Sequence, residues 1–145
     1  MAIEELSITM QTIQQLTEAA LAAAEHSHSP YSGFRVGSAL LLSNGATVTG
    51  TNIENVSYGL TICAERAALA TAVTQFGPQI RIRAVAVVNL NDAPSPPCGA
   101  CRQVLAEFMD ADGLVSFPAG AAGTVEAVTL PIRELLPYGF EMQLK

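Results

Sequence analysis

Two short stretches, Cys63-Ala64-Glu65 and Pro97-Cys98-Gly99-Ala100-Cys101, contain all three cysteines of the chain. Each stretch opens a segment with helical character, so the thiols are expected at the N-termini of two helices. A lone cysteine and a C-x-x-C pair together supply three thiolates, the ligand set of a zinc site with one open coordination position. Glu65 lies on the same first turn as Cys63, where it could move protons beside the metal. The spacing therefore predicts a catalytic metal centre.

The residues around these stretches predict helices and strands that alternate along the chain. Asn44-Gly45 lies between two apolar runs and indicates a hairpin turn, and the apolar residues 84–88 indicate a strand buried on both faces. The expected elements are a helix over residues 7–26 that begins at Ser7, strands 34–42 and 46–53, a helix 63–75 ended by Gly77-Pro78, a strand 82–90, a helix 101–109, strands 114–117 and 124–130, and a helix 131–135.

This order of elements predicts one α/β domain over residues 1–145, a three-layer α/β/α sandwich around a mixed five-stranded sheet. The two cysteine-bearing helices are expected to follow adjacent parallel strands. Because connections after such strands emerge at the same edge of a sheet, the two cysteine stretches can meet there, where ligands commonly bind.

The composition limits the partners and the compartment. A net charge of -6 with only seven scattered Lys and Arg argues against a nucleic-acid surface and favours a small neutral or cationic substrate. A charged fraction of only 14% and a positive mean hydropathy favour an oligomer. Residues 1–9 have no basic apolar run typical of a signal peptide, and no segment approaches the roughly 20 apolar residues of a membrane span. An odd number of cysteines favours metal or redox use, and the expected compartment is the cytoplasm.

Three thiolates around zinc carry a net negative charge, which would weaken the effect of the metal on the pKa of water. The N-termini of the two helices would offset part of this charge. Arg66 and Arg102, which follow Glu65 and Cys101 directly, could add full positive charges. We favour Arg66, although adjacency alone does not determine where a side chain points.

Each of these signals has an ordinary alternative when it is taken alone. Cys63 could be a small core residue, the C-x-x-C pair could form a structural zinc site or a redox dithiol, and Glu65 could be a solvated helix residue. Their occurrence together on separate helix starts matches the zinc deaminase signature H-x-E…P-C-x-x-C in a three-cysteine form.

At these residues the sequence resembles the cytidine deaminase family, in particular its small homotetrameric branch with three cysteine ligands. The resemblance covers nearly the whole chain. The matching elements are Pro30-Tyr31-Ser32-x-Phe34-x-Val36-Gly37, Asn52-Ile53-Glu54-Asn55, Tyr58, Ile62-Cys63-Ala64-Glu65-Arg66, Pro97-Cys98-Gly99-Ala100-Cys101-Arg102-Gln103, and Glu134-Leu135-Leu136-Pro137 followed by Phe140.

The resemblance implies roles around the metal. Cys63, Cys98 and Cys101 would bind one Zn²⁺ per subunit. Glu65 would be the proton shuttle, and Arg66 would stabilise the cysteine thiolates.

The resemblance also implies substrate contacts. Phe34 would stack on the pyrimidine, and Asn52 and Glu54 would hydrogen-bond the ribose hydroxyls. The backbone of Ala64, together with Glu65, would contact N3 and the amino group of the base. Two aromatic residues would reach the active site of a neighbouring subunit in the homotetramer, namely Tyr58 and Phe140.

Without the resemblance, Asn52 and Glu54 would be interpreted as exposed turn residues, and Phe34, Tyr58 and Phe140 as packing residues. The chain also departs from the common family pattern. Gly33 and Arg35 flank Phe34 where the family often has His and Pro, and Gly59 follows Tyr58 where Pro is frequent. These positions lie in loops that shape the pocket, so they bear on the choice of base and sugar.

The resemblance implies zinc-dependent hydrolytic deamination of cytidine and deoxycytidine to uridine and deoxyuridine, with release of ammonia, as in pyrimidine salvage. One alternative is a deaminase of another aminopyrimidine nucleoside such as blasticidin S. Asn52 and Glu54 argue against it, because they supply partners for an intact ribose. Another alternative is a non-catalytic zinc- or nucleoside-binding module, which would have no use for an acid/base at position 65.

Overall fold

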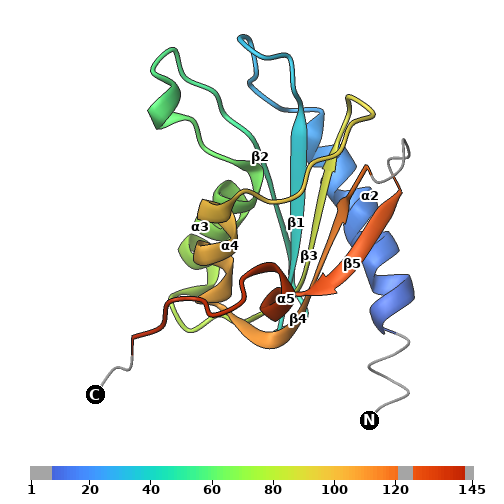
Figure 1. The fold of residues 1–145 in the computed structure, drawn as a ribbon, viewed down its shortest axis with the longest axis vertical. Coiled ribbons are helices and arrows are strands. Elements are labelled where there is room, and N and C mark those ends of the chain that lie inside the picture. The colour runs from blue at the N-terminus through green and yellow to red at the C-terminus, as the bar shows by residue number, and fades with distance from the viewer. Residues whose placement is uncertain (1–7, 121–125, 143–145) are drawn as a thin grey trace.

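The five strands form one mixed sheet in the order β2-β1-β3-β4-β5 (Figure 1). The computed structural model describes residues 8–120 and 126–142. β3 and β4 are parallel, and the other neighbouring strands pair antiparallel. The strands are β1 (Val36–Leu42), β2 (Thr47–Thr51), β3 (Ile82–Asn89), β4 (Met109–Pro118) and β5 (Ala127–Pro131).

The turn between β1 and β2 confirms the hairpin predicted from Asn44-Gly45. Gly45 has a φ of 88°, in the left-handed region that glycine adopts without steric cost. The Asn44 side chain accepts a hydrogen bond from the backbone N–H of Ala46 at 2.9 Å. The turn sets the register in which Leu41 pairs with Thr47.

Helices cover both faces of the sheet, so the predicted three-layer arrangement is confirmed (Figure 1). One face carries α2 (Ile13–Ala24), which follows a π-helical turn, η1 (Ile8–Thr12). The other face carries α3 (Ala64–Phe76), α4 (Gly99–Ala106) and the short α5 (Ile132–Leu135), and a 3₁₀ turn, η2 (Tyr58–Leu60), lies in the loop before α3. Among the described residues, no helix is long and apolar enough to cross a membrane.

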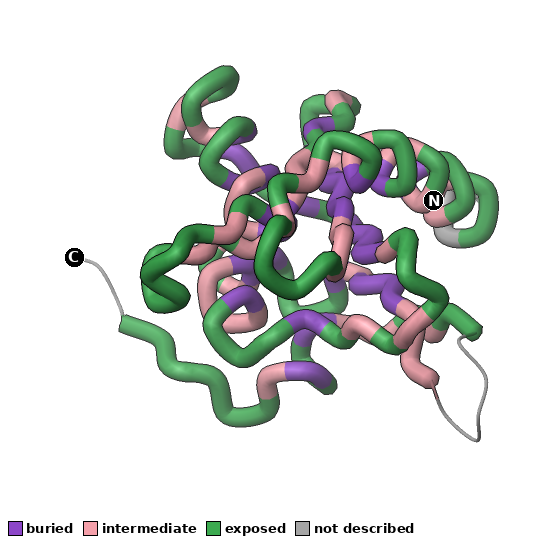
Figure 2. Tube along the Cα trace, turned by 90° about the horizontal axis from the view of Figure 1, so that it is seen from above, coloured by how far each residue is buried: buried purple, intermediate pink, exposed green. Residues whose placement is uncertain are grey.

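The alternation of side chains along β1 and β3 divides the core between the two faces. Leu40 and Val85 belong to the large cluster beneath α3, α4 and α5, whereas Ala39 and Ala86 belong to a smaller cluster beneath α2. Figure 2 shows the buried segments in the middle of the fold with exposed loops around them. The apolar run predicted as a doubly buried strand is therefore the centre of the molecule.

Two strand glycines let the helices approach the sheet closely. A Cβ at Gly50 in β2 would lie 2.3 Å from the backbone nitrogen of Ala68 and 2.7 Å from the carbonyl oxygen of Ala64, both in α3. A Cβ at Gly37 in β1 would lie 1.9 Å from the carbonyl oxygen of Ala20 in α2. The first turn of α3 thus rests directly on β2.

Part of the predicted topology is corrected by the structure. The strands that precede the two cysteine-bearing helices, β2 and β3, are not adjacent, because β1 lies between them. Both strands pair antiparallel with β1 and therefore run in the same direction. Their carboxyl ends still lie at one edge of the sheet, and α3 and α4 both begin beyond that edge.

Several predicted element bounds are also corrected. The strand expected to begin at residue 114 begins at Met109, because Met109 already pairs with Ile82 of β3. The preceding helix accordingly runs from Gly99 to Ala106 instead of over residues 101–109. Met10, which the periodicity places on the apolar face of the first helix, is 83% exposed, because the π-helical turn changes the register there. The proposed helix start at Ser7 and strand start at residue 124 lie outside the described residues.

Candidate active site

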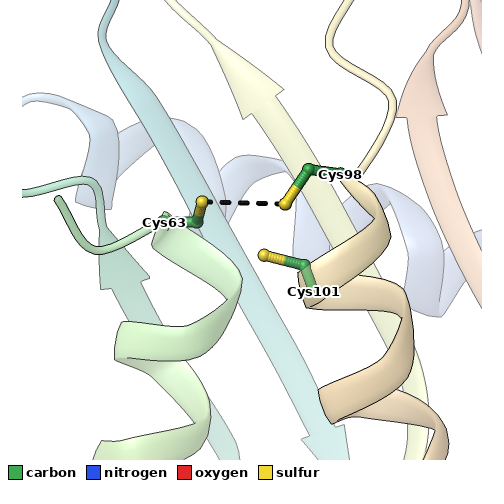
Figure 3. Close-up of side chains that lie close together, drawn as sticks. All are labelled: Cys63, Cys98 and Cys101. Carbon is green, nitrogen blue, oxygen red and sulfur yellow. Dashed lines mark hydrogen bonds between the residues drawn. The ribbon is translucent and has the colours of Figure 1, made fainter. Parts of the chain in front are cut away.

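The three cysteine sulfurs converge at the start of α3 and α4. All three Sγ atoms lie within 4.8 Å of one another, and those of Cys63 and Cys98 are 3.9 Å apart. Figure 3 shows the sulfurs pointing toward a common centre, one from the start of α3 and two from α4. Cys101 is buried, Cys63 is half-buried and Cys98 is exposed, so the cluster is open to solvent on one side.

Helix capping explains how the two stretches place their thiols. Cys63 and Cys98 are the N-cap residues of α3 and α4, and their carbonyls accept the first helical hydrogen bonds at 3.0 Å. Cys101 follows in the first turn of α4. The free N–H groups of both helix starts give positive potential near the sulfurs.

The two arginines near the cysteines have different roles. Nη2 of Arg66 donates to Sγ of Cys63 at 3.4 Å, and its buried Nε has no hydrogen-bond partner among the described residues. Arg102 instead donates from Nε to the carbonyl of Pro97 at 2.8 Å and from Nη1 to the carbonyl of Leu135 at 3.0 Å. The positive charge beside the thiols therefore comes from Arg66, and Arg102 ties the loop before α4 to α5.

The thiols perturb one another strongly. Hydrogen bonding from the Cys101 thiol, together with the bond and charge of Arg66, lowers the pKa of Cys63 to about 5 against the opposing effect of burial. The same hydrogen bond with Cys63 raises the pKa of Cys101, and burial adds to the increase. In turn, the bond to Cys63 raises the pKa of Arg66, whose charge is therefore permanent.

Glu65 is buried beside this cluster, with only 4% of its surface exposed. Burial raises the pKa of its carboxyl, and the negative charge of Cys63 raises it further. A solvated helix glutamate, the ordinary alternative for this position, is therefore excluded. A buried carboxyl with a raised pKa holds its proton to a higher pH than a solvated one, as suits a group that both accepts and releases a proton in a reaction.

Asn52 connects the end of β2 to the segment that carries Phe34. Its Nδ2 donates to the carbonyl of Phe34 at 2.7 Å, and its Oδ1 accepts from the N–H of Val36 at 3.0 Å and from the hydroxyl of Ser27. Asn52 is only 8% exposed, so its interpretation as an exposed turn residue is wrong. Phe34 itself is half-buried.

Glu54 fixes the loop just before Phe34. Its Oε1 accepts from the N–H groups of Tyr31 at 2.9 Å and Ser32 at 3.1 Å, and its Oε2 accepts from the Ser32 hydroxyl. The Ser32 hydroxyl bond is the main reason that the pKa of Glu54 is lowered. The same hydroxyl oxygen accepts from the N–H of Phe34 at 2.9 Å. The sequence interpretation gave Ser32 no role, although it lies within a matched motif.

The remaining predicted site residues lie on α3 or on exposed segments. Ala64 is fully buried as the first residue of α3. Tyr58 is 72% exposed on a loop closed at its base by reciprocal 2.9 Å bonds between Ile53 and Ile62. Phe140 is also 72% exposed.

The donor set fits zinc. Tetrahedral zinc with Zn–S bonds of about 2.3 Å places its thiolate sulfurs about 3.8 Å apart. The separation of 3.9 Å between Cys63 and Cys98 agrees with this value, and three cysteines leave the fourth position open. The cation at Arg66 and the two helix N-termini balance the negative charge of such a ligand set.

Comparisons with known proteins point to the same chemistry. The family model for the cytidine and deoxycytidylate deaminase zinc-binding region matches residues 10–116. The cytidine deaminase of Halalkalibacterium halodurans is 46% identical over 127 residues, which cover 88% of this chain and 92% of that protein.

Two crystal structures extend the similarity to the fold. The cytidine deaminase of Mycobacterium tuberculosis superposes with a TM-score of 0.75 at 37% identity, covering 89% of this chain and 97% of that one. The cytidine deaminase of Burkholderia pseudomallei superposes with a TM-score of 0.76 at 39% identity, covering 88% and 98%. This chain therefore belongs to the family of cytidine and deoxycytidylate deaminases with a zinc-binding region.

Proposed function

We propose that this protein is a cytidine deaminase, which hydrolyses the C4 amino group of cytidine and deoxycytidine to give uridine or deoxyuridine and ammonia. The observation that carries the proposal is the buried carboxyl of Glu65 beside three converging cysteine thiols. The relatives named as cytidine deaminases support the choice of substrate. The whole of residues 1–145 is proposed to serve this one catalytic domain.

Cys63, Cys98 and Cys101 hold one zinc ion per chain in this proposal. When bound there, zinc supplies a water of lowered pKa as the nucleophile. Arg66 keeps the thiolates charged by donating to Cys63, and the helix N-termini add to this effect.

Glu65 moves the protons of the reaction. It takes one proton from the attacking water and delivers it to N3 of the cytosine ring, which makes C4 more electrophilic, and the water oxygen forms a bond to C4. It then takes the remaining proton of that oxygen and delivers it to the amino nitrogen, so that the C4–N bond breaks, the oxygen stays as the C4 carbonyl and the nitrogen departs as ammonia. Its burial keeps bulk water from competing for these protons.

The groups that bind the nucleoside lie on two connected segments. Phe34 stacks on the pyrimidine, and the backbone of Ala64 contacts the edge of the base. Asn52 and Glu54 hydrogen-bond the ribose hydroxyls. This assignment is supported by the bonds that join Asn52 and Glu54 to the backbone around Phe34, because one preformed unit then presents the sugar and base contacts together.

The active form is proposed to be a homotetramer in which Tyr58 and Phe140 reach a neighbouring active site. Both side chains are largely exposed in the single chain, and the loop with Tyr58 also exposes Val56 by 77% and Leu60 by 67%. An apolar surface of this kind is typical of a subunit interface. Light scattering of the purified protein should give four times the 15.1 kDa chain mass.

The cytoplasm is the proposed compartment and pyrimidine salvage the proposed role. The three free thiols support this compartment, because a reducing environment keeps them available to a metal. In that role, the uridine released from cytosine nucleosides would be used to make uridine nucleotides.

The direct test is ammonia release by purified zinc-loaded protein, with the accompanying ultraviolet change. Cytidine, deoxycytidine, cytosine, adenosine and blasticidin S are supplied separately, and turnover is expected with the two cytosine nucleosides only. Turnover of blasticidin S alone would overturn the ribose contacts, and no turnover with zinc bound would favour a binding module.

A further inference from the structure

Asn91 bonds to the backbone on both sides of Phe34. Its Oδ1 accepts from the N–H of Arg35 at 2.8 Å, and its Nδ2 donates to the carbonyl of Gly33 at 2.9 Å. Asn91 is an exposed residue of the loop after β3, far from Phe34 in the sequence. One side-chain amide thus spans Phe34 with a matched donor and acceptor.

Asn91 is itself held in place by Asn89, the last residue of β3. Oδ1 of Asn89 accepts from the N–H of Asn91 at 2.9 Å, and its Nδ2 donates to the carbonyl of Ala93 at 2.7 Å and to the hydroxyl of Ser95 at 3.0 Å. These bonds fix the position of Asn91, and the same loop leads on to the metal ligand Cys98.

The segment around Phe34 needs such support. Gly33 has a φ of 69°, and a glycine in this region restrains its neighbours little. The backbone of Phe34 itself is held by Ser32 on its N–H and by Asn52 on its carbonyl, and the N–H of Leu90 donates to the next carbonyl, that of Arg35, at 2.9 Å. Asn91, in the loop after β3, adds the bonds to the N–H of Arg35 and the carbonyl of Gly33, and a proline at position 35 would lack that N–H.

We propose that Asn91 is a positioning residue of the active site, which clamps the backbone at Gly33 and Arg35 so that the ring of Phe34 is preorganised to stack on the base. The inference rests on the proposed function, in which Phe34 stacks on cytosine. Asn91 acts through Phe34 and contacts neither the metal ligands nor the proton carrier.

The kinetic test uses Asn91→Ala and Asn91→Asp. Asn91→Ala should raise KM about three- to tenfold for cytidine and by the same factor for deoxycytidine, with kcat within about twofold of wild type, because weaker preorganisation costs binding rather than chemistry. Asn91→Asp keeps the acceptor for Arg35 but loses the donor to Gly33, so its KM should be intermediate. Zinc content should not change.

Asn44→Ala is the matched control. Asn44 is also an exposed loop asparagine with one side-chain bond to a backbone N–H, but it lies in the turn at the opposite end of β1. Asn44→Ala should lower the free energy of unfolding by an amount similar to that in Asn91→Ala and leave KM unchanged. If Asn91→Ala leaves KM within twofold, or lowers kcat together with zinc content, the clamp is contradicted.

Amide hydrogen exchange tests the clamp without substrate. In Asn91→Ala, exchange should become at least about tenfold faster at Arg35 and also faster at Phe34, whereas Asn44→Ala should affect only Ala46 and its neighbours. Unchanged exchange at Phe34 would overturn the inference even if the enzyme were inactive. If the wild-type protein has no deaminase activity but Asn91→Ala still shows the expected faster exchange, the proposed function is overturned and the clamp is not.

Discussion

Nη2 of Arg66 lies 3.4 Å from Sγ of Cys63, one helical turn before it in α3. The contact places a permanent positive charge against a thiolate that the proposed zinc site needs. Arg66→Ala should therefore lower zinc affinity about tenfold, the lower end of the range for groups that support metal ligands. Competition with a chromophoric chelator measures this change.

Arg102→Ala is the control for this prediction. Arg102 donates to the carbonyls of Pro97 and Leu135. Its loss should lower the free energy of unfolding by about 1–3 kcal/mol, because both acceptors are left without their partner. Its effect on zinc affinity should be clearly smaller than that of Arg66→Ala. Equal losses of zinc affinity in the two variants would remove the special role of Arg66.

Gly50 should control the geometry of the metal site, because it allows α3 to pack closely against β2. A Cβ at Gly50 meets the backbone of Ala68 at 2.3 Å, so Gly50→Ala should displace the first turn of α3 and move Cys63 relative to α4. We expect an altered visible absorption spectrum of the cobalt-substituted protein and a stability loss of about 1–3 kcal/mol.

Gly37→Ala provides the matched comparison for Gly50→Ala. It creates a similar backbone clash, but against α2 on the opposite face of the sheet. It should destabilise the protein to a similar extent and leave the cobalt spectrum of the folded protein unchanged. Identical spectra for both variants would contradict a positioning effect of Gly50.

The Ser32 hydroxyl should set the charge state of Glu54 in acid. Its hydrogen bond is the main reason that the pKa of Glu54 is lowered, so Ser32→Ala should raise that pKa toward the ordinary value. Because the pKa of Glu54 is depressed in the folded state, its carboxylate stabilises the folded protein at neutral pH. This stabilisation is lost as the pH falls through the folded-state pKa. In Ser32→Ala the loss should begin at a higher pH.

Carboxyl carbon NMR of labelled Glu54 follows this titration directly. Ser43→Ala, which removes a hydroxyl from the turn at the other end of β1, serves as the control and should leave the titration of Glu54 unchanged. A wild-type titration in Ser32→Ala would show that the two backbone N–H bonds alone determine the pKa of Glu54.

Local sequence signals predicted most of the elements. Asn44-Gly45 predicted the hairpin, the apolar run of β3 predicted a doubly buried strand, and Gly77, with a φ of 88°, ends α3 as expected. The start of β4 escaped prediction because Asp110 and Asp112 are exposed and carry no apolar alternation. They lie in the irregularity between the pairs Ile82–Met109 and Ala84–Leu114, and the strand extends back to Met109 because that residue pairs with β3, which is not a local property.

The candidate site divides in the same way. The convergence of Cys63, Cys98 and Cys101 was predictable from their placement at two helix starts. The burial of Asn52 and the clamp by Asn91 were not predictable, because a polar residue in a loop gives no signal of a partner far away in the sequence. Such contacts depend on how the loops at the edge of the sheet fold against one another.

Glu65 is the proposed carrier of the protons in a zinc-dependent deamination. The decisive measurement compares ammonia release from cytidine by zinc-loaded wild type, Glu65→Ala and the isosteric Glu65→Gln, with zinc content determined in each. Because burial raises the pKa of Glu65, a neutral amide should be tolerated there without loss of fold or metal. We predict a kcat at least about 10²-fold lower in both variants with zinc still bound. Turnover close to that of wild type in either variant would contradict this role of Glu65.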